Sequence, residues 1–320
     1  MEKYGHVGVL MGGCSSEREI SLKSGSAVYA ALKDAGCRVS PIDIVSIQEA
    51  DVIRLLQDLK IDVAFIALHG QFGEDGVIQA ILEKINIPYS GSDVEASRLA
   101  INKVATQELL KSRNVPVADY VVVQSREMKN TTNLLKIIKK FPVVVKPANQ
   151  GSSVGITLVE SPDGLLSALE EAFLYDKEVL VERYIKGREL TVGILDQTAL
   201  PIIEIRSKSK FFDFVAKYQS VTTQYLIPAS LPQEISTIVQ AIALQAYHAL
   251  GCRDLSRVDI MLNDEYCPYV LEVNTIPGFT ATSLLPKAAK AVGIDFTQLC
   301  LKIVELACRR AKKDQHSFAQ

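Results

Sequence analysis

Short apolar runs alternate with helical stretches through the first hundred residues of this chain. The apolar runs at 7–11, 39–44 and 63–68 are separated by helical patterns from about 20 to 35 and near 52–59. The run at 63–68 is continuously apolar, as in strands buried on both faces of a parallel sheet. This β-α-β-α-β order predicts an open parallel α/β domain, in which ligands bind beyond the carboxyl ends of the strands.

Two further units are expected after residue 100. Helices are predicted near 101–112, 133–140 and 232–250, and a further helix is predicted to begin at Ser161-Pro162, with serine as N-cap. Strands are predicted at 120–123, 143–146, 156–159, 178–182, 189–195, 199–205, 259–262 and 269–274. The polar segment 207–224 exceeds a normal connection and is interpreted as an active-site lid or a disordered insertion. The predicted domains are therefore 1–100, 101–185 and 186–320.

Composition excludes several classes of protein. The chain has 320 residues and a net charge of −2, so nothing indicates a nucleic-acid-binding surface. No apolar run reaches the length of a membrane span, and the N-terminus lacks the pattern of a signal peptide. The six cysteines form no C-x-x-C pair, so we expect free thiols in the cytoplasm. The basic end at 309–313 is interpreted as a solvated helix end.

Oxygen-bearing side chains gather on two neighbouring predicted strands near the end of the chain. Glu272 and Asn274 are two residues apart and so share one face of a strand, and Asp259 lies on a strand that could pair with it. Two carboxylates and an amide suit a hard cation that also holds phosphate oxygens. The simpler alternative is an ion-pair network, in which Arg257 merely pairs with Asp259.

A lysine and a glycine loop predict an anion site. Lys146 ends an apolar strand, and Gly151 and Gly155 follow in a loop that brings N–H groups close to an anion. The alternative is an exposed lysine before a hairpin turn. The loop is neither a Walker motif nor a dinucleotide fingerprint.

Three other polar residues have both a functional and a structural interpretation. Glu182 lies at a predicted seam between units and could bind a base and ribose, although a surface charge at a strand end is the simpler interpretation. His69 follows a buried strand, where a functional role is plausible, but a lone histidine is usually structural. Glu17 belongs either to a binding loop or to an acidic helix N-terminus.

Together these motifs resemble the D-alanine–D-alanine ligase family of the ATP-grasp superfamily. The matching segments run in family order and cover nearly the whole chain: GGCSSEREISLKSG, FIALHGQFGEDGVIQ, PYSGSDVEAS, INKVATQELL, VVVKPANQGSSVGI, LVERYIKGRELTV, FDFVAKYQSVTTQY, SRVDIML and LEVNTIPGFTATSLLP. The resemblance implies an N-terminal Rossmann-like α/β domain followed by a two-domain ATP-grasp fold. It implies an enzyme that joins two D-alanines with ATP and two Mg²⁺ or Mn²⁺ ions for peptidoglycan synthesis, commonly as a homodimer.

The resemblance also assigns the nucleotide and metal contacts. It implies that ATP phosphates are held by Lys103, Lys146 and Ser153. The adenine and ribose contacts that it implies are Glu182, Arg183, Ile185, Glu189, Phe211 and Leu271. The metal ligands that it implies are Asp259, Glu272 and Asn274.

The substrate contacts follow from the same resemblance. It implies that Glu17 binds the ammonium of the first D-alanine, with His69 beside it and with Tyr218 bonded towards Glu17 and Ser152. Arg257 and the Gly278 N–H are implied to stabilise the reacting oxyanion. Ser283 and the Leu284 N–H are implied to receive the carboxylate of the second D-alanine, and Lys217 and Tyr218 are implied to be residues of the lid, with Lys217 binding substrate.

A few positions depart from the family pattern without removing a ligand. Ser256 stands where glycine is common, Ile276 where a smaller residue is frequent, and Cys14 where a hydroxyl or small residue is usual. The alternatives to D-alanine ligation are a ligase that uses D-lactate as second substrate, which Tyr218 argues against, and a non-catalytic nucleotide-binding protein.

Overall fold

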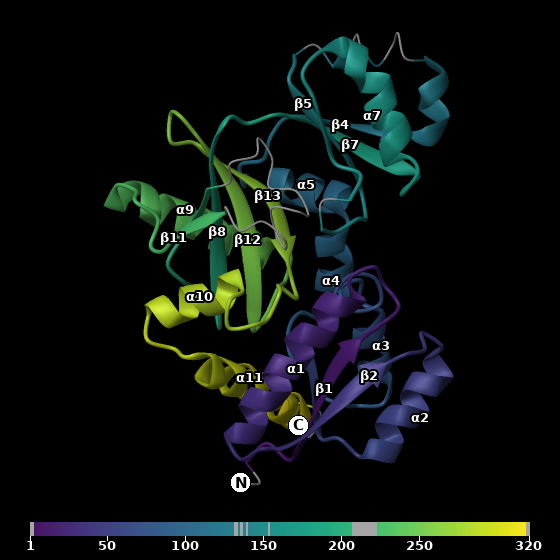
Figure 1. The fold of residues 1–320 in the computed structure, drawn as a ribbon, viewed down its shortest axis with the longest axis vertical. Coiled ribbons are helices and arrows are strands. Elements are labelled where there is room, and N and C mark those ends of the chain that lie inside the picture. The colour runs from purple at the N-terminus through teal and green to yellow at the C-terminus, as the bar shows by residue number, and fades with distance from the viewer. Residues whose placement is uncertain are drawn as a thin grey trace.

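The chain folds into three α/β units arranged along one long axis (Figure 1). The computed structural model describes residues 3–130, 134, 137, 138, 140–152, 154–206 and 223–317. Most of the predicted helix at 133–140, the core of the predicted lid, and Ser153, Phe211, Lys217 and Tyr218 therefore lie outside the described residues.

The N-terminal unit is the parallel α/β domain that the sequence predicts. Its sheet has the order β2 (Arg38–Ile44), β1 (His6–Gly12), β3 (Val63–Ile66), and both pairings are parallel. The helices of this unit are α1 (Arg18–Asp34), α2 (Glu49–Leu59) and α3 (Val77–Lys84). The loops that carry Glu17 and His69 follow β1 and β3, so both lie at the carboxyl edge of the sheet.

The C-terminal helix shares its core with this N-terminal unit. Val28 and Leu32 of α1 belong to one buried cluster with Leu299 and Ile303 of α11 (Phe296–Ser317), to which α10 (Leu284–Ala291) also contributes. Figure 1 shows α11 beside α1, near the N-terminus. The last helix therefore packs against α1, in a cluster that also contains Leu195, Ile203 and Leu255 of the third unit.

The basic end of the chain is not simply a solvated helix end. Arg310 of α11 pairs with Asp254, whose side chain is only 4% exposed, and donates to the Tyr89 carbonyl at 2.6 Å. Asp254 also accepts from the Gly91 N–H at 2.8 Å. Burial raises the pKa of Asp254, and Arg310 opposes this rise. The interpretation of Arg310 as a solvated residue is wrong because this ion pair lies between three chain segments.

The central unit contains an antiparallel sheet. Its order is β4 (Tyr120–Gln124), β7 (Glu178–Arg183), β5 (Val143–Pro147), β6 (Thr157–Val159). The accompanying helices are η1 (Ser125–Asn130), η2 (Pro162–Gly164) and α7 (Leu165–Ala172). A helical stretch starts at Pro162 as predicted, as a 3₁₀ turn that continues directly into α7, but Ser161 makes no side-chain capping bond among the described residues.

The third unit is a larger antiparallel sheet backed by α9 (Gln233–Ala249). Its order is β11 (Gln224–Leu226), β10 (Ile203–Arg206), β8 (Gly187–Leu195), β12 (Leu255–Asn263), β13 (Pro268–Asn274), and β9 (Thr198–Ala199) pairs with β8. The single strand predicted at 199–205 is wrong, because it is divided into β9 and β10. Pro201 lies between the two and has no N–H to donate to a ladder.

Two short helices connect the N-terminal and central units. The helix predicted near 101–112 is confirmed as α5 (Lys103–Ser112), and it follows a helix that was not predicted, α4 (Val94–Ile101). Asn102 has an extended backbone and its side chain accepts from the Ala105 N–H at 2.8 Å, which caps α5. This break places Lys103 at the first position of α5.

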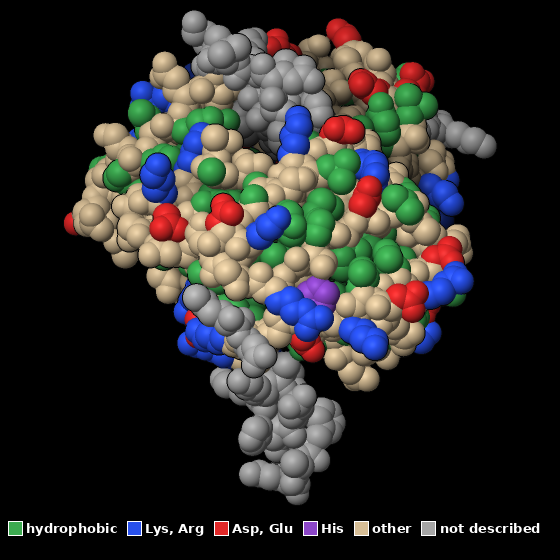
Figure 2. Space-filling model, turned by 60° about the horizontal axis from the view of Figure 1, so that its bottom comes forward, with side chains coloured by type: hydrophobic (Ala, Val, Ile, Leu, Met, Phe, Trp, Pro, Cys, Tyr) green, Lys and Arg blue, Asp and Glu red, His purple; other side chains and the backbone are tan. Residues whose placement is uncertain are grey.

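The surface carries both signs of charge. On the face in Figure 2, Lys and Arg side chains are interspersed with Asp and Glu side chains and with hydrophobic ones. No helix within the described part of the chain is long and apolar enough to cross a membrane.

Candidate active site

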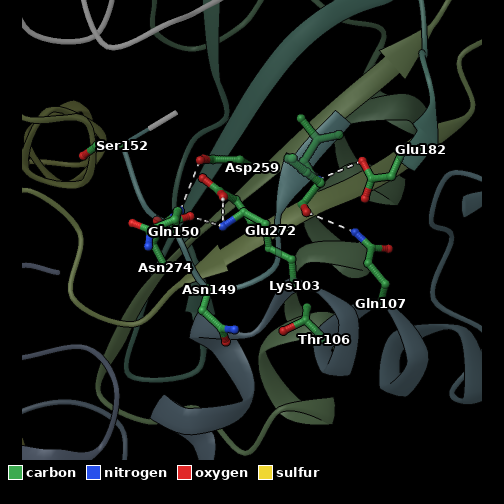
Figure 3. A network of polar contacts seen from close by, with 12 residues as sticks. Lys103, Thr106, Gln107, Asn149, Gln150, Ser152, Glu182, Asp259, Glu272 and Asn274 are labelled. Atoms are coloured by element: carbon green, nitrogen blue, oxygen red, sulfur yellow. Dashed lines mark hydrogen bonds and ion pairs between the residues drawn. The ribbon is translucent and has the colours of Figure 1, made fainter. Parts of the chain in front are cut away.

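The pairing of β12 with β13 brings together the three residues predicted to bind metal. In the antiparallel register Asp259 faces Glu272 and Arg257 faces Asn274. The Asn274 amide donates to the Asp259 carboxylate at 3.2 Å. Figure 3 shows Asp259, Glu272 and Asn274 gathered on these strands beside Lys103. The predicted convergence on one side of two paired strands is therefore confirmed.

Arg257 forms a bidentate ion pair with Asp259. Its Nε donates to one carboxylate oxygen at 2.9 Å and its Nη2 to the other at 2.8 Å. The ion pair between Arg257 and Asp259, which the sequence left open as an alternative to a metal site, is thus present. Thr191 of β8 adds a third bond to this carboxylate at 2.6 Å. Asp259 is consequently held in one orientation, and a cation bound there would lie close to the guanidinium.

Lys103 connects the glycine loop with the carboxylate cluster. Its backbone N–H donates to the Ala148 carbonyl at 2.8 Å, and its ammonium donates to the Gln150 carbonyl. The same ammonium lies 3.7 Å from a carboxylate oxygen of Glu272 (Figure 3). Because the side chain is only 7% exposed, its charge acts in a poorly solvated space.

Lys146 and Glu182 form a buried ion pair. Lys146 ends β5, Glu182 lies on the neighbouring β7, and their charged atoms are 2.8 Å apart. Both side chains are at most 7% exposed, so the interpretation of Glu182 as a surface charge is wrong. Among the described residues, the second Glu182 oxygen, Oε1, is buried without a hydrogen-bond partner.

The other described residues predicted to contact adenine or ribose come from β7, the segment after it, β8 and β13. The Arg183 guanidinium lies 5.7 Å from the centre of the Tyr269 ring, Ile185 is buried, and Glu189 lies on β8 opposite Met261. The Leu271 carbonyl accepts from Gln107 at 3.1 Å. These residues therefore come from both antiparallel sheets.

The N-terminal unit reaches the glycine loop through Glu17. Glu17 is the N-cap residue of α1, but among the described contacts its side chain caps no backbone N–H. It accepts instead a hydrogen bond from the Ser152 hydroxyl. A Cβ at Gly70 would meet the Glu17 carboxylate at 2.6 Å, so glycine leaves room for this side chain. Glu17 is thus more than a charge at a helix end.

A cavity of about 550 Å³ collects most of the predicted catalytic and substrate-binding residues. Its lining includes Glu17, His69, Lys103, Ser152, Arg257, Glu272, Asn274, Gly278, Ser283 and Leu284. Asp259, Lys146, Glu182, Arg183, Ile185, Glu189 and Leu271 lie outside this lining. One cavity therefore contains most of the predicted substrate-binding residues and two of the three predicted metal ligands, Glu272 and Asn274. The residues predicted to contact the base do not line it.

A half-buried lysine of α10 lies next to a residue that lines the cavity. Ser283, the N-cap residue of α10, accepts from the Thr280 N–H at 3.0 Å. Lys287 lies 4.1 Å from the centre of the ring of Tyr225, which lines the cavity. Burial lowers the pKa of Lys287.

Ser24, Gln107 and Tyr225 were not predicted from the sequence to belong to the site. The helical repeat could have indicated that Ser24 and Gln107 belong to the site. Ser24 lies two turns after Glu17 on α1, and Gln107 one turn after Lys103 on α5, so each shares a face with a predicted site residue.

The chain matches known proteins over most of its length. The family model described as D-ala D-ala ligase C-terminus matches residues 109–305, and the N-terminus model matches residues 46–92. The chain belongs to the D-alanine–D-alanine ligase family. It is 44% identical over 307 residues to a D-alanine–D-alanine ligase of Hydrogenovibrio crunogenus, and this alignment covers 96% of each chain.

Solved structures of the family have the same fold as this chain. The D-alanine–D-alanine ligase of Bacillus anthracis complexed with ATP is 38% identical, with a TM-score of 0.85 over 97% of this chain and 99% of that chain. The VanG D-Ala:D-Ser ligase of Enterococcus faecalis is 30% identical, with a TM-score of 0.81 over 94% and 99% of the two chains. The resemblance to this ligase family and the predicted ATP-grasp fold are therefore confirmed.

The side chains fit a nucleotide and a hard cation. The unpartnered Glu182 oxygen is an acceptor suited to the exocyclic amine of a base, while Lys103 and Lys146 are cations suited to phosphates. Within the described residues no group of three or more His, Cys, Asp or Glu side chains could hold a metal ion. Asp259, Glu272 and Asn274 supply oxygen ligands, so a bound cation would also need oxygens from phosphates or water.

Proposed function

We propose that this ligase joins two D-alanine molecules into D-alanyl-D-alanine with ATP, for peptidoglycan synthesis. The observation that supports this most strongly is the single cavity lined by Glu17, Lys103, Arg257, Glu272 and Gly278. One bound pair of substrates can therefore meet a carboxylate that binds an ammonium, a lysine that binds phosphate, and donors that bind an oxyanion.

The first step we propose is phosphorylation of the first D-alanine. Its ammonium binds Glu17, whose position is fixed by Ser152. Lys103 and Lys146 bind ATP phosphates, with Ser153 in the glycine loop and the base beside Glu182 and Leu271. Phosphoryl transfer depends mainly on positioning and charge neutralisation, which two poorly solvated ammonium groups supply.

Divalent cations complete this phosphate site in the proposal. Asp259, Glu272 and Asn274 would hold one or two Mg²⁺ or Mn²⁺ ions, which supply charge neutralisation at the transferred phosphate. Arg257 already contacts both Asp259 oxygens, at 2.9 and 2.8 Å. The guanidinium would therefore lie beside the phosphate and help orient it.

The second step we propose is attack of the second D-alanine on the acyl phosphate. Its amine adds to the acyl carbon, phosphate leaves, and the amine loses a proton. Arg257 and the Gly278 N–H stabilise the oxyanion, and the loss of one such donor typically costs about 3 kcal/mol. Ser283 and the Leu284 N–H receive the carboxylate, with Lys217 and Tyr218 from the segment 207–224 proposed as a lid that excludes water.

D-Alanine is favoured over D-lactate as second substrate because the curated relatives are D-alanine–D-alanine ligases. The VanG structure, a D-Ala:D-Ser ligase of the same fold, means that fold alone does not decide the choice. Arg257, Asp259, Glu272 and Asn274 are all retained, which argues against a non-catalytic nucleotide-binding protein.

A direct assay tests the proposed reaction. The purified protein is given ATP, Mg²⁺ and either D-alanine, L-alanine or no amino acid, and ADP and products are resolved by mass. We expect ADP and D-alanyl-D-alanine only with D-alanine, and depsipeptide as a minor product when D-lactate competes. ADP without dipeptide would contradict the proposed acceptor, and no ADP would favour a non-catalytic protein.

Location and assembly are further parts of the proposal. We propose a cytoplasmic homodimer, in keeping with the N-terminal-domain dimers implied by the family resemblance. Light scattering of the purified protein tests the assembly, and a monomer at micromolar concentration would contradict it. Cell fractionation tests the location, and recovery in the membrane or secreted fraction would contradict it.

A further inference from the structure

Two buried polar side chains connect the N-terminal unit to the segment that follows β13. Ser24 of α1 is fully buried and His69, after β3, is 4% exposed. The resemblance places His69 beside the first D-alanine, whereas the described bonds of its ring run to other parts of the protein. Ser24 has no role in the proposed reaction as described above.

The contacts of these side chains form one continuous chain of hydrogen bonds. His69 Nδ1 lies 3.1 Å from the Ile276 carbonyl oxygen and 3.4 Å from a Glu74 carboxylate oxygen. His69 Nε2 lies 2.9 Å from the Ser24 hydroxyl, which accepts from the Phe279 N–H at 3.2 Å. The bonds therefore join the loop after β3, helix α1 and both ends of the segment 276–279.

The acceptors define where the imidazole proton resides. A carbonyl and a carboxylate both face Nδ1, and each can only accept, so Nδ1 carries the hydrogen. In the neutral ring Nε2 then accepts from the Ser24 O–H, which leaves the Ser24 oxygen lone pairs for the Phe279 N–H. Every donor in this chain meets an acceptor.

Both anchored residues flank Gly278. Ile276 is two residues before it and Phe279 one residue after it, while β13 has already ended at Asn274. Pro277 lies between and lacks an N–H, so this segment has fewer backbone donors of its own. The direction of the Gly278 N–H therefore depends on how 276 and 279 are held.

We propose that Ser24 is a positioning residue that, with His69 in its Nδ1–H form, aims the Gly278 N–H at the reacting oxygen. The inference rests on the proposed ligation and on the oxyanion role of Gly278 within it. Ser24 does not touch substrate in this account. It acts through the backbone of Phe279, and His69 acts through the backbone of Ile276.

Steady-state kinetics of Ser24→Ala test the proposal. The matched control is Ser97→Ala, because Ser97 is also a fully buried helical serine, and its hydroxyl has no hydrogen-bond partner among the described residues. We expect Ser24→Ala to lower kcat by about 10- to 100-fold, the usual range for losing a group that orients a reacting one, with the KM for ATP changed less than about twofold. Ser97→Ala is expected to retain wild-type kcat.

The outcomes separate this inference from the proposed function. Equal kcat in Ser24→Ala and Ser97→Ala, with an active wild type, would overturn the inference alone. A loss in Ser24→Ala that appears only as a higher KM for ATP would also overturn it. An inactive wild type would instead overturn the proposed function. If Ser24→Ala does not fold, Ser24→Cys keeps a weaker donor and acceptor and is judged by the same criteria.

The tautomer provides a second test that needs no activity. Nitrogen chemical shifts of ¹⁵N-histidine-labelled protein distinguish the two neutral forms, and His69→Gln assigns the His69 signals among the four histidines. We expect His69 as the Nδ1–H form in wild type. A dominant Nε2–H form would contradict the hydrogen-bond chain and the proposal with it.

Discussion

At the scale of single residues, the site is built from polar groups that hold one another in place before substrate binds. Asp259 is bonded by Arg257, Thr191 and Asn274, and Glu17 is bonded by Ser152. Fixed charges need little rearrangement during reaction, which is the basis of electrostatic stabilisation of a transition state. Because these groups are bonded to one another, removing one charge also leaves its hydrogen-bond partners without a fixed position.

Glu272→Gln tests the metal assignment. The substitution removes a negative charge beside Lys103 and weakens the binding of a hard cation, so we expect kcat to fall at least about 100-fold, equivalent to about 2.7 kcal/mol. The control is Glu265→Gln on the exposed β12–β13 turn, which should leave turnover unchanged. Near-normal kcat in Glu272→Gln across a Mg²⁺ titration would rule out the assignment.

Some residue environments could not be predicted from the sequence. Glu182 lies at the end of an apolar strand and was interpreted as a surface charge, because nothing local indicates that Lys146 on a neighbouring strand neutralises it. Asp259, Glu272 and Asn274 could be grouped in advance, since strand alternation and pairing of adjacent strands are local properties. Long-range partners require the register between strands, which the sequence pattern alone leaves open.

At the scale of elements, a helix boundary positions Lys103. The apolar pattern near 101–112 predicted one helix correctly but not the α4 helix before it, because the break depends on the extended backbone of Asn102. The division of the predicted 199–205 strand has a similar origin, in the missing N–H of Pro201. Periodicity predicted α5 and a strand within 199–205, whereas single capping and breaking residues set the ends of these elements.

Asn102→Ala tests this positioning. The substitution removes the bond to the Ala105 N–H, so we expect a loss of about 1 kcal/mol in the free energy of unfolding and a higher KM for ATP as Lys103 loses its fixed start. Urea denaturation and steady-state kinetics measure the two effects. Asn102→Asp keeps a side-chain acceptor and should restore most of the stability and of the wild-type KM for ATP. An Asn102→Ala variant with an unchanged KM for ATP would contradict the link between this cap and Lys103.

At the scale of the whole molecule, contacts distant in sequence join the N-terminal unit to the rest of the chain. The α11 helix shares a core with α1, and the Arg310–Asp254 pair joins that helix to the turn before β12 and to the Tyr89–Gly91 segment. The sequence predicted the α/β character of each unit but not this packing, which depends on chain ends far apart in sequence. The predicted boundaries at 100 and 185 stay a prediction.

Arg310→Ala tests the importance of this connection. The substitution leaves a buried carboxylate without its cation, so we expect a loss of about 3–5 kcal/mol in the free energy of unfolding at pH 8. The neighbouring Arg309→Ala removes only an exposed pair with Glu305 and should cost under about 0.5 kcal/mol. Equal losses in the two variants, measured by urea denaturation, would contradict the account.

The pH dependence of Arg310→Ala has a defined sign. Burial already raises the pKa of Asp254 above its unfolded value, and loss of Arg310 raises this pKa further. The folded state then binds the proton more tightly than the unfolded state, so its relative stability rises as the pH falls through the folded pKa. We therefore expect the loss in free energy of unfolding, relative to wild type, to shrink as the pH is lowered from 8 towards the pKa of Asp254 in the unfolded state. A loss that grows on acidification would contradict this.

Thiol exposure gives another prediction for the whole molecule. Cys14 and Cys267 are exposed, whereas Cys252 is buried, and burial raises the pKa of its thiol to about 12. In native protein at pH 8 we expect a thiol reagent to modify Cys14 and Cys267 rapidly and Cys252 only after unfolding, as peptide mass mapping would show. Rapid native labelling of Cys252 would contradict the described packing.

The most direct test of the proposed reaction follows one oxygen atom. D-Alanine labelled with ¹⁸O in both carboxylate oxygens is turned over with unlabelled ATP, and the released phosphate is analysed by mass. An acyl phosphate route leaves one carboxylate oxygen on the phosphoryl group, so the account predicts one ¹⁸O in each phosphate formed together with dipeptide. Unlabelled phosphate in the presence of dipeptide would contradict it.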